Sequence, residues 1–168
     1  SHIPNNIYPS IHPSIYLSPL SSLSPLSPYK KTPLMPKYIF ETRIEVRDYE
    51  CDIEGIVNNA NYLHYMEHTR HLFLRHAGLS FADMHAKGVD AVVARMNLQY
   101  KVPLRCDDIM ISRLWMEKQG LRYIFHQDIF RESDEKLSCR ATVELVCLVN
   151  GKLASSPDYD KAFQPFMQ

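Results

Sequence analysis

Residues 40–47 alternate between an apolar or threonine side chain and a charged one, reading F-E-T-R-I-E-V-R. A period of two is typical of a β-strand that buries one face. The period changes at residues 60–77, where apolar side chains recur every three or four positions, as on one face of an α-helix. Asn58 or Asn59 is suited to cap the start of this helix, and Gly78 is suited to end it.

Four more strands are predicted after the helix, at about 89–102, 107–118, 121–131 and 136–149. The last is the clearest, because one face carries Cys139, Ala141, Val143, Leu145, Cys147 and Val149 and the other carries Ser138, Arg140, Thr142 and Glu144. Gly120 and the sequence E-S-D-E at 132–135 mark short reversals, so neighbouring strands should be antiparallel. Residues 157–166 hold a short terminal helix at best. One long helix packed on an antiparallel sheet predicts an α+β domain.

Residues 1–34 differ from the rest in composition. They contain eight Ser and seven Pro but no Asp, Glu or Arg. So many prolines work against a ladder of backbone hydrogen bonds, so we expect this segment to be disordered. It could be a transit peptide, a functional Pro-rich tail, or upstream sequence outside the natural protein. We favour a natural start at Met35, which makes 35–168 the folded domain.

The chain has 168 residues, enough for one domain with a core, and its formal net charge is zero. This balance gives no indication of a nucleic-acid partner. Its four cysteines include no C-x-x-C pair, so we expect reduced thiols in a cytoplasmic protein, with plastid import as the alternative. No apolar run is long enough to predict a membrane span.

Asp52 stands just before the predicted N-terminus of the long helix. A carboxylate beside free backbone N–H groups suits acyl transfer to water, because the N–H groups can stabilise the charge that develops on a carbonyl oxygen. The plain alternative is that Asp52 only shapes the turn or caps the helix. Gly55 would give that turn the conformational freedom it needs to lead into the helix.

Two stretches resemble a known family. They are E-C-D-I-E-G-I-V-N-N-A-N-Y at residues 50–62 and Y-K-V-P-L-R-C-D-D at residues 100–108. The first resembles the D-x-D-x-x-G-x-V motif and helix start of hotdog-fold acyl-CoA thioesterases of the 4-hydroxybenzoyl-CoA thioesterase family. The resemblance implies a hotdog fold, a five-stranded antiparallel sheet wrapped around the helix at 60–77. It also implies hydrolysis of an acyl-CoA or acyl-carrier-protein thioester to free acid and thiol.

The resemblance assigns roles to residues of the first motif. The catalytic carboxylate falls on Asp52, as nucleophile or general base, and the backbone N–H that polarises the thioester carbonyl falls on Asn59. Many relatives carry His or Tyr at this second position, and asparagine is no acid or base near neutral pH, so only the backbone N–H is expected to act. Glu67 is the second candidate acid, with an orienting or structural role. The residues expected to contact the substrate are Gly55, Asn58, Tyr62, Met66 and Glu67.

The implied reaction uses no metal or redox cofactor, and coenzyme A enters only as part of the substrate. Basic residues near the pocket mouth could meet its phosphates; the candidates are Lys101, Arg105, Arg122 and Arg140. Relatives form homodimers with sheets joined edge to edge and often pair again into homotetramers, so the same assembly is implied for this chain.

Two other classes of protein compete with this interpretation. The sequence H-Y-M-E-H at His64–His68 matches the H-x-x-E-H motif of a zinc metallopeptidase, in which His64 and His68 would bind zinc and Glu67 would activate water. Glu144 is a candidate third ligand, although it falls on a predicted strand. The other alternative is a non-catalytic hotdog protein that binds an acyl chain, against which Asp52 argues.

Overall fold

The structure is a computed structural model that describes residues 37–167. Its strands are β1 (Phe40–Glu45), β2 (Val89–Tyr100), β3 (Ile109–Gln119), β4 (Arg122–Arg131), β5 (Leu137–Val149) and β6 (Lys152–Leu153). Its α-helices are α1 (Asn59–His76), α2 (Phe81–Ala86) and α3 (Pro157–Phe163), and its 3-10 helices are η1 (Asp48–Glu50) and η2 (Gln164–Phe166). The predictions about the Ser/Pro-rich segment 1–34 lie outside the described residues.

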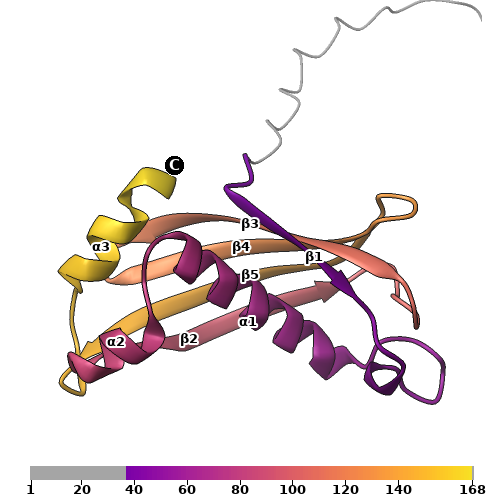
Figure 1. Ribbon diagram of the computed structural model, residues 1–168, viewed down its shortest axis with the longest axis horizontal. Coiled ribbons are helices and arrows are strands. Elements are labelled where there is room, and N and C mark those ends of the chain that lie inside the picture. Colours follow the sequence, from indigo (N-terminus) through magenta and orange to yellow (C-terminus); the bar gives the residue numbers. More distant parts are fainter. Residues whose placement is uncertain (1–36, 168) are drawn as a thin grey trace, which may run out of the picture. The chain divides into compact units, whose positions relative to one another are not determined.

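The sheet is antiparallel with strand order β1-β3-β4-β5-β2, and α1 lies across one of its faces (Figure 1). The predicted α+β hotdog fold is thereby confirmed. The sheet also has a sixth strand, β6, which contributes only two residues and pairs with the end of β5. The short helix α2 was not predicted, although Ser80 caps it by accepting a hydrogen bond from Asp83 N at 3.3 Å.

The two ends of α1 are fixed by the residues that the sequence indicated. Asn58 is the N-cap, and its side chain accepts a hydrogen bond from Ala60 N at 3.0 Å. At the other end Gly78 adopts a φ of +81°, and the N–H groups of Gly78 and Leu79 return to the carbonyls of Arg75 and Leu74. This pair of bonds is a Schellman motif, which satisfies carbonyls that the helix leaves free.

The inner face of α1 packs against the concave side of the sheet. Met66 and Phe73 are completely buried there, together with Leu114 of β3, Phe125 of β4 and Val143 of β5. The burial of so much apolar surface holds α1 in place, and with it the helix N-terminus. Within residues 37–167, no helix is both long and apolar enough to cross a membrane.

Ser138 departs from the predicted alternation of β5. It was expected on the face opposite Cys139, yet only 1% of its surface is exposed. The pairing of β4 with β5 shifts here, because Ile129 pairs with Cys139 while Phe130 pairs with Leu137. Ser138 is therefore the extra residue of a β-bulge, a feature that re-aims a side chain.

Candidate active site

Asp52 lies in a tight loop between η1 and α1. Its backbone N–H donates to the Ile56 carbonyl at 2.8 Å, and its Oδ1 accepts hydrogen bonds from Glu54 N at 3.1 Å and Ile56 N at 3.4 Å. Gly55 closes the loop with a φ of +71°, a conformation that side chains disfavour. The loop thus holds the carboxylate through Oδ1, while Oδ2 has no partner among residues 37–167.

Asn59 is the first residue of α1, so its N–H has no partner inside the helix. No acceptor in the described part of the chain takes a hydrogen bond from it. The aligned peptide dipoles of the 18-residue helix also make this end attractive to negative charge. A donor of this kind can stabilise the oxyanion that forms when a carbonyl is attacked.

Asp52 and Asn59 line the same cavity, of about 350 Å³. Its other lining residues are Ile56, Val57, Tyr62, Tyr100, Lys101, Val102, Pro103 and Ser138. The Tyr100 hydroxyl donates to the Asn59 carbonyl at 3.1 Å, so it ties the end of β2 to the start of α1. The cavity is therefore built by the two sequence stretches that carry the family resemblance, together with β5.

A buried carboxylate, Glu50, joins the Asp52 loop to α1. Its side chain accepts hydrogen bonds from the backbone N–H and guanidinium of Arg47, at 2.8 and 3.1 Å, and from the Tyr65 hydroxyl at 2.7 Å. Its backbone carbonyl accepts from Asn58 N at 2.9 Å and Asn61 Nδ2 at 2.7 Å. Burial and the bond to Glu50 raise the pKa of Tyr65, which keeps its hydroxyl a donor. The sequence alone gave no role to Glu50.

The predicted substrate-contact residues occupy different places. Tyr62 lines the cavity, and its hydroxyl accepts a hydrogen bond from Leu104 N at 3.2 Å. Gly55 and Asn58 form the loop and the helix cap beside the cavity. Met66 is buried in the core one turn further along α1. Glu67 is exposed, and its carboxylate lies 3.7 Å from His71 Nε2.

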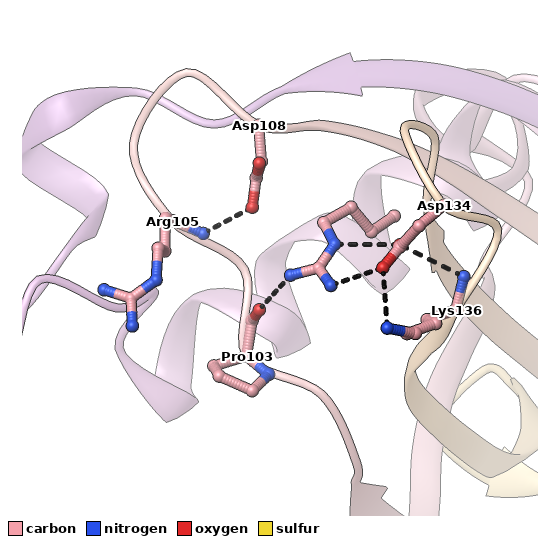
Figure 2. Close-up of polar contacts among 6 residues, drawn as sticks. Pro103, Arg105, Asp108, Asp134 and Lys136 are labelled. Carbon is pink, nitrogen blue, oxygen red and sulfur yellow. Dashed lines mark hydrogen bonds and ion pairs between the residues drawn. The ribbon is translucent and has the colours of Figure 1, made fainter.

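The segment after β2 is held in place by Arg131, whose guanidinium donates to the Pro103 carbonyl at 3.2 Å. The same guanidinium makes two hydrogen bonds to Asp134, at 2.9 and 2.7 Å, and Lys136 also pairs with Asp134 (Figure 2). In the same view, Asp108 accepts a hydrogen bond from Arg105 N at 2.8 Å. The turn between β4 and β5 thus braces one wall of the cavity.

The four candidate basic residues divide into two pairs. Lys101 lines the cavity, and the Arg105 guanidinium donates to the Gly55 carbonyl at 3.4 Å. The other two are paired with acids elsewhere on the sheet: Arg122 with Glu144 at 3.1 Å and Arg140 with Asp128 at 2.7 Å.

Within residues 37–167, no three His, Cys, Asp or Glu side chains gather as a metal site would require. Glu144 is paired with arginines on the sheet.

Comparison with known proteins shows the family of this chain. The family model of the Thioesterase-like superfamily matches residues 46–164. The long-chain acyl-CoA thioesterase FadM of Escherichia coli is 31% identical over 109 residues, which cover 64% of this chain and 82% of FadM. The acyl-acyl carrier protein thioesterase ATL3 of Arabidopsis thaliana is 37% identical over 92 residues, 54% of this chain and 48% of ATL3.

Solved structures give the same result. The DHNA-CoA thioesterase of Staphylococcus aureus superimposes with a TM-score of 0.68 at 28% identity, covering 74% of this chain and 88% of that one. The chain therefore belongs to the thioesterase-like superfamily, and it is a thioester hydrolase with a hotdog fold.

Two hydroxyl-bearing residues of the cavity, Tyr100 and Ser138, were given no role from the sequence alone. Tyr100 stands in the second motif, so its position was signalled there although its contact with Asn59 was not. Ser138 gave no signal, because the bulge that buries it depends on the pairing between β4 and β5.

Proposed function

We propose that this chain hydrolyses acyl-CoA or acyl-carrier-protein thioesters with Asp52 as the catalytic carboxylate and the Asn59 N–H as the donor to the carbonyl oxygen. One observation carries the proposal: both groups line one cavity, and each has a polar atom without a partner in the described residues. The proposed chemistry needs no metal. The Asp52 carboxylate can activate water or attack the thioester itself, and the helix N-terminus can stabilise the negative charge on the carbonyl oxygen.

In the general-base route, Asp52 takes a proton from water while the water oxygen bonds to the acyl carbon. The carbonyl oxygen becomes negative and accepts the Asn59 hydrogen bond. The C–S bond then breaks, the carbonyl re-forms, and the thiolate takes up the proton from Asp52. In the nucleophilic route, Asp52 attacks the acyl carbon, and the C–S bond breaks to release the thiolate and leave an anhydride. Water then hydrolyses this anhydride to the free acid and the Asp52 carboxylate, and a proton released in this step neutralises the thiolate. Both routes need Asp52 ionised.

Both carriers present the thioester on a phosphate-bearing pantetheine arm. Lys101 at the cavity and Arg105 beside Gly55 are two cations at this end of the site that could contact the phosphate of such an arm. The relatives include both an acyl-CoA thioesterase and an acyl-carrier-protein thioesterase. An assay with both kinds of substrate therefore identifies which carrier this enzyme uses.

We also propose a homodimer joined through β2, with further pairing into a tetramer. In the described sheet β2 is an edge strand that pairs only with β5, and Val93 on it is 46% exposed. Unpaired strand edges favour pairing with another chain.

A cytoplasmic location is supported by the four cysteines, all of which are free thiols.

The experiment is thiol release from acyl-CoAs of short, medium, long and aromatic chains and from acyl-carrier proteins. Wild type is compared with Asp52→Ala and with Glu54→Gln, a matched control in which an exposed acid of the same loop loses its charge. We expect Asp52→Ala to lose activity by orders of magnitude and Glu54→Gln to resemble wild type. Wild-type turnover in Asp52→Ala would refute the proposed site.

A further inference from the structure

Ser138 has a buried hydroxyl without a partner. Two buried side-chain polar atoms among residues 37–167 lack a hydrogen bond, Ser138 Oγ and the Tyr159 hydroxyl. Buried polar groups are nearly always paired, and an exception calls for an explanation. Only the first of the two belongs to a residue of the cavity that Asp52 and Asn59 line.

A β-bulge in β5, which interrupts the regular pairing with β4, places Ser138 at the cavity. The bulge in β5 turns it from the outer face to a buried position, and its carbonyl accepts a hydrogen bond from Lys101 N at 2.8 Å. Bulges are over-represented beside active sites, where they re-aim side chains. The bulge thus places an unpaired hydroxyl in the buried wall of the cavity.

Two other hydroxyls line the cavity. Tyr100 donates its proton to the Asn59 carbonyl, and the Tyr62 oxygen is held by the hydrogen bond that it accepts from Leu104 N. Ser138 Oγ differs from both because it has no hydrogen-bond partner among the described residues, and its hydroxyl can donate after a change of one side-chain torsion. The strong acceptor of an acyl thioester is its carbonyl oxygen. A donor in a wall that excludes water acts on such an oxygen more strongly than one in solvent.

We propose that Ser138 is a further catalytic residue, whose hydroxyl donates a hydrogen bond to the thioester carbonyl oxygen beside the Asn59 N–H. The inference rests on the proposed function, since it needs the acyl group to bind at Asp52. No bond is made or broken by Ser138, which only shares the charge that develops on the oxygen.

Steady-state kinetics and melting temperatures of wild type, Ser138→Ala and Tyr159→Phe test the proposal. The loss of one such donor lowers activity by about 100-fold in other acyl-transfer enzymes, and we expect this for kcat/KM of Ser138→Ala. Its melting temperature should not fall, because the hydroxyl has no partner to lose. Tyr159→Phe removes the other unpaired hydroxyl and should change neither quantity. Ser138→Cys keeps the size with a weaker donor and should share the loss.

A spectroscopic measurement identifies the oxygen. Acyl-CoA labelled with ¹³C at the carbonyl is bound to Asp52→Asn, and its C=O stretch is compared with that in Asp52→Asn/Ser138→Ala. We expect a higher frequency in the double variant, because a hydrogen bond to the carbonyl has gone. An unchanged frequency, or unchanged kcat/KM in Ser138→Ala, would overturn the role of Ser138. Full activity in Asp52→Asn would instead overturn the proposed function.

Discussion

The Tyr65 hydroxyl donates a 2.7 Å hydrogen bond to Glu50 Oε2 in the protein interior. Tyr65 belongs to α1 and Glu50 to η1, which precedes the Asp52 loop. Through its backbone carbonyl, Glu50 also accepts hydrogen bonds from Asn58 N and from the side-chain amide of Asn61. One carboxylate residue therefore sets the distance between the loop that carries Asp52 and the helix that carries Asn59.

Tyr65→Phe should lower the free energy of unfolding by about 1–3 kcal/mol, because it leaves a buried carboxylate without one of its donors. Urea denaturation measures the change. Tyr159→Phe is the matched control, since it deletes a buried tyrosine hydroxyl that has no partner, and it should be neutral. Equal losses in the two variants would show that the Glu50 contact contributes nothing.

Gly55→Ala should cost about 1 kcal/mol of stability because its φ of +71° disfavours a side chain, and it should also lower kcat. Space is not the cause, since a Cβ there would lie 3.9 Å from Arg105 Nη1. Gly120→Ala is the control, with a φ of +58° in the turn between β3 and β4 and no atom within 4 Å. It should lose similar stability and keep full activity. Equal kcat values in the two variants would show that the geometry of the Asp52 loop does not affect catalysis, which would contradict this prediction.

Arg131→Met should raise KM for the acyl substrate by about two- to tenfold, as expected for the loss of one net hydrogen bond of about 0.5–1.5 kcal/mol. The substitution frees the Pro103 carbonyl and so loosens a wall of the cavity. Lys136→Met also removes a cation from Asp134 but leaves Pro103 untouched, and its KM should not move. An equal rise of KM in both variants would mean that the effect comes from disturbing the turn between β4 and β5, and not from the lost hydrogen bond to the Pro103 carbonyl.

Most of the fold could be predicted from the sequence because the periodic spacing of apolar residues is a local signal. The alternation in β1 and β5 and the three-to-four spacing in α1 each reflect the face that the element buries. The caps at Asn58 and Gly78 followed from side-chain chemistry and backbone freedom in the same local way. The helix α2 was not predicted because its six residues are too few to show a helical period of apolar side chains.

The candidate site was predictable only in part. Asp52, Asn59 and Tyr62 are close in sequence, so one motif carried them together. Glu50 and Ser138 depend on pairing between distant segments, and no local pattern tells a buried carboxylate or a bulge from ordinary surface residues.

The cysteines should differ sharply in reactivity. Burial raises the pKa of Cys139 and of Cys147 to about 11, so at pH 8 both stay protonated as well as covered. Cys106 is exposed and Cys51 is partly so. Iodoacetamide should label Cys106 first, then Cys51, and the buried pair only on unfolding, as mass spectrometry of peptides can follow. Early labelling of Cys139 would contradict the packing of β5.

The central claim is that the ionised carboxylate of Asp52 drives hydrolysis. Asp52→Asn tests it most directly, because the amide oxygen can still accept the Glu54 and Ile56 hydrogen bonds that shape the loop. The decisive measurement is kcat of this variant on the preferred acyl thioester, with the melting temperature as a check on folding. We predict an intact fold and a kcat lower by orders of magnitude. A folded variant with wild-type kcat would contradict the account.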